Sequence, residues 1–139
     1  MARTHSMVPA AGAESLAPRA ALSPAEQAYR ILQVGFVVLP IVAGADKFLH
    51  LLTEWHRYLA PPFAEWFGGG HAFMYAVGVI EIAAGIGVAL WPRFFSWVVG
   101  LWLCAIAVNL VIGGWYDIAL RDVGLAVAAF AMARLARSA

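Results

Sequence analysis

Apolar residues dominate four long stretches of the chain, and short polar breaks separate them. The stretches cover about 24–52, 71–91, 94–114 and 117–136. A bilayer core of about 30 Å requires about 20 apolar residues in helical form, and each stretch approaches or exceeds that length. The fourth stretch is the weakest, because its purely apolar part covers only Val123 to Ala133. The pattern predicts an all-α membrane protein, a four-transmembrane-helix bundle.

The first stretch begins with a capping signal and is followed by an aromatic, charged segment. Ser23, Pro24 and Glu26 stand in the order of a capping box with proline at the first helical position. After this helix, "TEWHRYLAPPFAEWF" interleaves aromatic and charged residues, which predicts an interfacial segment along the membrane surface between helices 1 and 2. Residues 1–22 are rich in Ala, Pro and Ser and are expected to form a flexible tail before one transmembrane domain, 23–139.

The composition strengthens the membrane interpretation and excludes other classes of protein. Of 139 residues, 63% are hydrophobic and 12% are charged, whereas soluble domains have about 45–50% apolar and about 25% charged residues. The formal net charge of +1 provides no basic field for nucleic acid. Cys104 is the single cysteine, so an intramolecular disulfide and a cysteine-based metal site are excluded.

The cationic residues divide unequally between the two ends of the predicted bundle. Six arginines lie on the side of the termini and three cations lie on the opposite side. Cytoplasmic loops carry the excess of Lys and Arg, so both termini are expected in the cytoplasm. The six are Arg3, Arg19, Arg30, Arg93, Arg134 and Arg137, and the three are Lys47, Arg57 and Arg121.

Adjacent charged residues stand near the outer ends of the first and fourth helices. Asp46 and Lys47 diverge by about 100° around the helix, so each needs its own partner. Lys47 is expected to reach Asp117 or Asp122, and Arg121 is expected to reach Asp46 or to pair with Asp117, four residues earlier. A cross-helix charge cluster is therefore predicted. Whether it is solvated at the interface, structural, or a ligand- or proton-handling site stays open.

Glu81 lies about ten residues into the second helix, near the predicted middle of the bilayer. An ionised carboxylate there costs several kcal/mol, so it should be protonated or partnered. Glu81 shares a helix face with Gly78 and Gly85, which directs it into the bundle. It is either a functional group or a protonated residue that donates one hydrogen bond. The candidate intramembrane and charge-cluster site comprises Asp46, Lys47, His50, Glu81, Asp117, Arg121 and Asp122.

The interfacial segment offers contacts and no catalytic machinery. Trp55, His56 and Tyr58 are candidate quinone or interface contacts. No nucleophile–base pair, phosphate-binding loop or nucleotide motif occurs, so no catalytic residue is assigned. The histidines form no facing pair in mid-membrane and no tight ligand spacing, so neither haem nor a metal is expected. Quinone is the one cofactor that stays under consideration.

Several short motifs resemble the DoxX-like family of small four-helix bacterial membrane proteins. They are "AGADKF", then Tyr58 and Pro61, Glu81 with Gly85 and Gly87, Pro92-Arg93, and "DIALRDVGLAVAAFAMARL", spread over residues 30 to 135. The resemblance implies a four-helix bundle in the bacterial inner membrane. It also implies quinone-linked redox chemistry, because some relatives are membrane subunits of a thiosulfate:quinone oxidoreductase, while others are linked to thiol and oxidative-stress complexes.

The short loops leave no room for a soluble catalytic domain. We therefore expect an accessory subunit of a larger, respiratory or other energy-converting complex, without catalytic activity alone and with membrane lipid and other membrane subunits as partners. A quinone-interacting redox subunit of the thiosulfate:quinone oxidoreductase type is the alternative. A small transporter or proton conductor that uses Glu81 is the third hypothesis.

Overall fold

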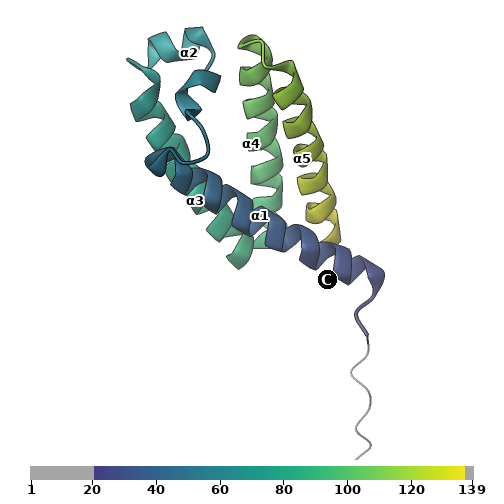
Figure 1. The fold of residues 1–139 in the computed structure, drawn as a ribbon. Helices are drawn as coiled ribbons and strands as arrows, with labels where there is room; N and C mark the ends of the chain where they lie inside the picture. Colours follow the sequence, from purple (N-terminus) through teal and green to yellow (C-terminus); the bar gives the residue numbers. More distant parts are fainter. Residues whose placement is uncertain (1–20, 137–139) are drawn as a thin grey trace, which may run out of the picture.

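The computed structural model describes residues 21–136, which form helices joined by short connections and contain no strand (Figure 1). The expected tail, 1–22, lies outside the described residues up to residue 20. The prediction of an all-α protein is confirmed for the described residues. The elements are α1 (Pro24–Leu49), the 3₁₀ helix η1 (Trp55–Tyr58), α2 (Pro61–Trp66), α3 (Gly70–Leu90), α4 (Pro92–Ile112) and α5 (Tyr116–Leu135).

The start of α1 confirms the predicted capping box. The Glu26 amide donates to Ser23 Oγ at 3.2 Å, and the Ser23 amide donates to Glu26 Oε2 at 2.8 Å. Pro40 lies inside the helix without ending it. The helix stops at Leu49, three residues before the predicted 52, because His50 adopts a left-handed conformation with φ of 54°.

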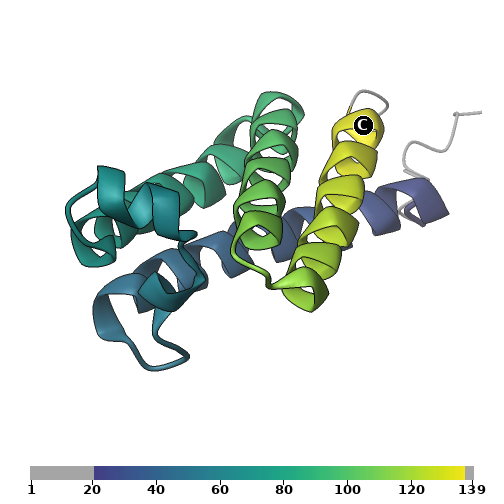
Figure 2. The ribbon, with the colours of Figure 1, turned by 90° about the horizontal axis from the view of Figure 1, so that it is seen from above.

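The long helices form two antiparallel pairs, α1 with α3 and α4 with α5. In Figures 1 and 2, α1 crosses obliquely past α4 and α5, and the contacts between the pairs are fewer than those within them. Residues 50–69 and the turn 113–115 lie at one end, the linker end (Figure 1). The start of α1, the turn between α3 and α4, and the end of α5 lie at the other, the terminal end (Figure 1).

Glycines bring α1 and α3 into backbone contact. A Cβ atom added at Gly44 would lie 2.6 Å from the carbonyl oxygen of Gly78, and one at Gly85 would lie 2.8 Å from that of Val37. Small residues allow such approach between helices in lipid, where dispersion and hydrogen bonds drive association. The face of α3 that was expected to point into the bundle therefore contacts α1.

Aromatic rings fill the space beside glycines in the rest of the bundle. The ring of Phe130 lies over Gly100 between α5 and α4, and the ring of Phe95 lies over Gly87. A buried apolar cluster joins the pairs nearer the terminal end, with Met132 of α5 at 0% exposure. The cluster consists of Phe36, Ala84, Val88, Val99, Ala129 and Met132.

Three helices, α1, α3 and α4, are long and apolar enough to cross a membrane. The protein is therefore a multi-pass membrane protein. The predicted second, third and fourth helices each begin one or two residues earlier than expected, at Gly70, Pro92 and Tyr116. Helix α5 has 20 residues, but Asp117, Arg121, Asp122 and Arg134 lower its apolar content.

Candidate functional site: a buried charge cluster

The centre of the candidate site is an ion pair between α1 and α3. Lys47 Nζ lies 2.5 Å from Glu81 Oε2, and the side chains are only 3% and 12% exposed. In an α-helix the Cα–Cβ bonds tilt toward the N-terminus. Because α1 and α3 are antiparallel, Lys47 and Glu81 therefore lean toward each other across the Gly44–Gly78 contact. Glu81 thus has a charged partner, which is one of the two outcomes expected from its depth in the helix.

Trp55 covers the ion pair from the connecting segment. Lys47 Nζ lies 3.9 Å from the centroid of the Trp55 ring, a geometry that stabilises an ammonium by about 0.5–2 kcal/mol. The Trp55 indole N–H donates to Asp46 Oδ2 at 2.7 Å. One aromatic side chain therefore contacts both members of the adjacent Asp46-Lys47 pair, although these two diverge around α1.

Asp46 binds the start of the connecting segment. Its Oδ1 accepts hydrogen bonds from the backbone amides of Leu51 and Leu52 at 2.9 and 3.0 Å. Together with the Trp55 indole, these donors surround a carboxylate whose residue is 4% exposed. The negative charge is stabilised locally by N–H groups. Asp46 therefore ends α1 and folds the chain back over Lys47.

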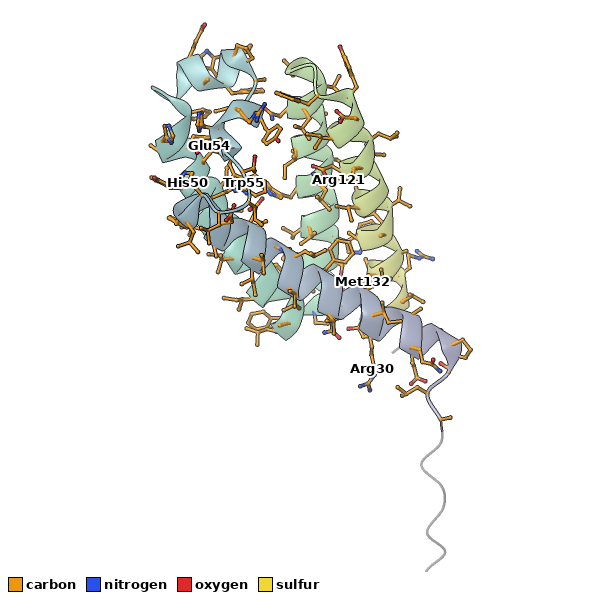
Figure 3. All side chains as sticks on the ribbon, in the orientation of Figure 1. Arg30, His50, Glu54, Trp55, Arg121 and Met132 are labelled. Carbon is orange, nitrogen blue, oxygen red and sulfur yellow. The ribbon has the colours of Figure 1, made fainter. Side chains whose placement is uncertain are left out.

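Asp122 brings α5 to the edge of the cluster. It is 7% exposed, and its charge acts on both Lys47 and Glu81. Arg121 Nε lies 3.4 Å from Asp122 Oδ1, but the Arg121 side chain is 66% exposed (Figure 3). Asp122 is thus a second buried carboxylate within electrostatic range of Lys47, and its own ion-pair contact is with Arg121, which lies largely outside.

Asn109 attaches the connecting segment to α4. Its Nδ2 donates to the Tyr58 carbonyl at 2.8 Å, and its Oδ1 accepts from the Ala60 amide at 3.0 Å. Its partners are the last residue of η1 and the connection that follows it. The Tyr58 ring also packs edge-on against Trp115, at 5.0 Å between centroids. The segment is thus held to both helix pairs.

Three histidines, His50, His56 and His71, lie near one another at the linker end. The rings of His56 and His71 lie 4.3 Å apart between centroids, and those of His50 and His71 lie 6.3 Å apart. His56 Nδ1 lies 3.4 Å from Glu54 Oε2 without hydrogen-bond geometry. Among residues 21–136, no group of three or more ligating side chains has the geometry to hold a metal ion.

The structure corrects several expected pairings. Lys47 pairs with Glu81 and not with Asp117 or Asp122. Arg121 contacts the adjacent Asp122 and reaches neither Asp46 nor Asp117. The ring of His50 lies near those of His71 and Tyr75, and Asp117 is exposed. The side chains that contact one another are Asp46, Lys47, Trp55 and Glu81, and Asp122 lies within electrostatic range of Lys47 and Glu81.

Trp55 and Asn109 were missed as part of this arrangement. Trp55 was expected to act as an interface or quinone contact, and Asn109 was not among the candidate site residues. A usable signal was present in the sequence. The Asp46 carboxylate needs hydrogen-bond donors and the Lys47 ammonium is stabilised by an aromatic face, and Trp55, nine residues after Asp46, can supply both. No spacing rule predicts that a segment between helices returns to Asn109.

No family model, curated protein or solved structure matches this chain. The resemblance to the DoxX-like family therefore stays a prediction from short motifs. The chemistry of the site has to be argued from its geometry. The cluster holds charge in an apolar protein and binds α1 and α3 to each other and to the segment that follows α1. It contains no nucleophile activated by a base among its described residues.

Proposed function

We propose that the protein is a four-helix membrane subunit, with α5 as the fourth span, that works within a larger membrane assembly and has no catalytic activity alone. The observation that supports this is the internal pairing of the cluster. Lys47 pairs with Glu81 and contacts the Trp55 ring, and Asp46 accepts hydrogen bonds from backbone amides and from the Trp55 indole. Groups that satisfy one another inside the protein fix how helices dock and leave little capacity for a substrate.

The charge pattern of α5 supports its assignment as a span. Asp117, Arg121 and Asp122 lie in its first two turns, at the linker end, and Arg134 lies in its last turn. Between them, 123–133 contains no charged residue. Charged side chains near helix ends reach the interface, while Asp122 turns inward to the cluster.

The assembly hypothesis is tested by purifying the tagged protein in mild detergent and measuring its mass in native gels and by cross-linking. We expect migration in a respiratory or other energy-converting complex, with the same large subunits at fixed stoichiometry, and loss of that complex's turnover when the gene is deleted. A monodisperse free protein at every detergent concentration would contradict the proposal.

A quinone-interacting redox subunit of the DoxX-like, thiosulfate:quinone oxidoreductase type is the second candidate. The observation that favours it is the contact of Lys47 with the Trp55 ring, with Asp122 of α5 within electrostatic range of Lys47 and the exposed Arg121 beside Asp122. An aromatic face beside a cation suits a head group with carbonyl oxygens.

The third hypothesis is a transporter or proton conductor that uses Glu81. This function would require the ion pair between Glu81 and Lys47 to break during transport.

One double variant separates these candidates. Lys47→Met/Glu81→Met replaces the ion pair by apolar side chains of comparable length, so the helices should still dock. If the pair is structural, the variant assembles and the complex keeps its turnover. If the pair lines a quinone site, the variant assembles but quinone-dependent turnover falls, and Glu81→Gln and Arg121→Ala reduce it as well.

The proposed location is the bacterial inner membrane, with both termini in the cytoplasm. The excess of arginine at the terminal end supports this orientation. Fusions of a fluorescent protein and of a periplasmic phosphatase to the C-terminus test it. We expect fluorescence without phosphatase activity. Phosphatase activity without fluorescence would show that the C-terminus lies in the periplasm.

A further inference from the structure

A hollow lies at the turn between α3 and α4, far along the chain from the charge cluster. The hollow is open to the surface and has a volume of about 500 Å³. Its wall is almost entirely apolar, with one charged side chain. The lining residues are Leu90, Trp91, Pro92, Arg93, Phe94 and Trp97.

The position of the hollow coincides with a membrane boundary. Its lining residues belong to the end of α3 and the start of α4. The turn between these helices lies at the terminal end (Figure 1), and both helices are apolar enough to cross a bilayer. Tryptophan favours the level of lipid head groups, and Trp91 is 65% exposed. The hollow therefore opens where head groups meet acyl chains.

Charge at this end favours an anionic occupant. Arg93 is exposed, and no carboxylate of residues 21–136 forms an ion pair with it. The one described acid at this end, Glu26, is bound in the capping box. The described cations there are Arg30, which points away from the bundle in Figure 3, Arg93 and Arg134.

The linker end has the opposite balance. Its exposed side chains in the described range include three acids and two arginines, in addition to the buried cluster. They are Glu54, Glu65, Asp117, Arg57 and Arg121. The attraction for an anion is therefore specific to the terminal end.

We infer that this hollow binds an anionic phospholipid. The phosphate lies against the Arg93 guanidinium, which forms bidentate hydrogen bonds with phosphate oxygens. One acyl chain follows the apolar wall formed by Phe94 and Trp97, and Trp91 packs at the glycerol level. Basic pockets between membrane helices on the cytoplasmic side bind acidic head groups in this way.

Native mass spectrometry of the full-length protein tests this inference. Protein delipidated in detergent is titrated with phosphatidylglycerol or phosphatidylcholine of identical acyl chains. We expect one phosphatidylglycerol molecule to bind more tightly than phosphatidylcholine does. Arg93→Gln should weaken the binding of phosphatidylglycerol about fivefold and leave the binding of phosphatidylcholine unchanged. Arg134→Gln removes the same charge from the same end outside the hollow and should leave the preference intact.

A second variant tests the apolar wall. Trp97→Ala should reduce retention of both lipids while preserving the preference between them, because it shortens the acyl contact and leaves Arg93 in place. Inorganic phosphate should not displace the lipid at concentrations that saturate simple arginine sites. Equal binding of the two lipids, or equal losses in Arg93→Gln and Arg134→Gln, would overturn the inference.

Discussion

The two helix pairs are held together by different means. Between α1 and α3, backbones touch at Gly44 and Gly78, and an ion pair beside this contact is buried under Trp55. Between α4 and α5, the Phe130 ring fills the space over Gly100, without an ion pair between these two helices among the described residues. The first interface has one arrangement that satisfies its polar groups, whereas the second depends on shape alone and should tolerate substitution better.

The largest effect is expected from breaking the ion pair on one side. Glu81→Met leaves Lys47 buried without its carboxylate, which should lower the free energy of unfolding by about 3–5 kcal/mol. Lys47→Met/Glu81→Met removes both charges and should recover most of that loss. Equilibrium unfolding in mixed detergent micelles measures both. A double variant as unstable as the single one would show that the pair contributes more than mutual neutralisation.

Glycine substitutions compare the two interfaces directly. Gly44→Ala places a Cβ atom 2.6 Å from the Gly78 carbonyl oxygen, a backbone atom that cannot turn away. We expect a loss of about 1–3 kcal/mol. In Gly100→Ala, the added Cβ atom meets the Phe130 ring, which can rotate. The loss of stability in this variant should therefore be smaller than in Gly44→Ala.

Gly35→Ala is the matched control in α1, because nothing lies within 4 Å of its added Cβ. It should leave stability unchanged or raise it slightly, since alanine favours helix. Thermal unfolding of the three variants in one detergent gives the order. A larger loss for Gly100→Ala than for Gly44→Ala would reverse the comparison.

Asn109→Ala should act locally, on the connection between the pairs. It leaves the Tyr58 carbonyl and the Ala60 amide without their partner, at a cost of about 1–3 kcal/mol. Hydrogen exchange should accelerate in residues 55–66 more than in α3 or α4. Val108→Ala, at an exposed neighbouring position, should not change exchange in this segment. Uniform acceleration along the chain would contradict a local role.

The smallest effect is expected at Arg121. The side chain is 66% exposed and its one ion-pair contact, to Asp122, is 3.4 Å long. Exposed pairs of this kind contribute less than about 1 kcal/mol, so Arg121→Gln should change the unfolding midpoint little. A loss comparable with that of Glu81→Met would show that Arg121 belongs to the inner cluster and that the contrast between the pairs is wrong.

Much of the fold could be predicted because its signals are local. Apolar runs of sufficient length gave the four long helices, and the order of Ser23, Pro24 and Glu26 gave the start of the first. The face of α3 that carries Glu81 could be predicted because glycines at helical spacing mark close helix contacts. None of these inferences required knowledge of which helices are neighbours.

The partner of Lys47 could not be predicted by depth alone. The residue lies near the end of α1 and Glu81 near the middle of α3, so counting residues from the helix ends suggested different levels in the membrane. In the structure, α3 begins about two turns before Gly78, the residue that meets Gly44. Glu81 therefore lies only one turn past the crossing of the two helices. The tilt of both side chains covers the remaining distance.

The Lys47–Glu81 pair also bears on biogenesis. A solitary α1 leaving the translocon would leave Lys47 without its carboxylate partner, and a solitary α3 would expose Glu81 to hydrocarbon. Since each supplies what the other lacks, we expect the two helices to enter the bilayer together as a hairpin, with α1 waiting at the lateral gate until α3 has been synthesised.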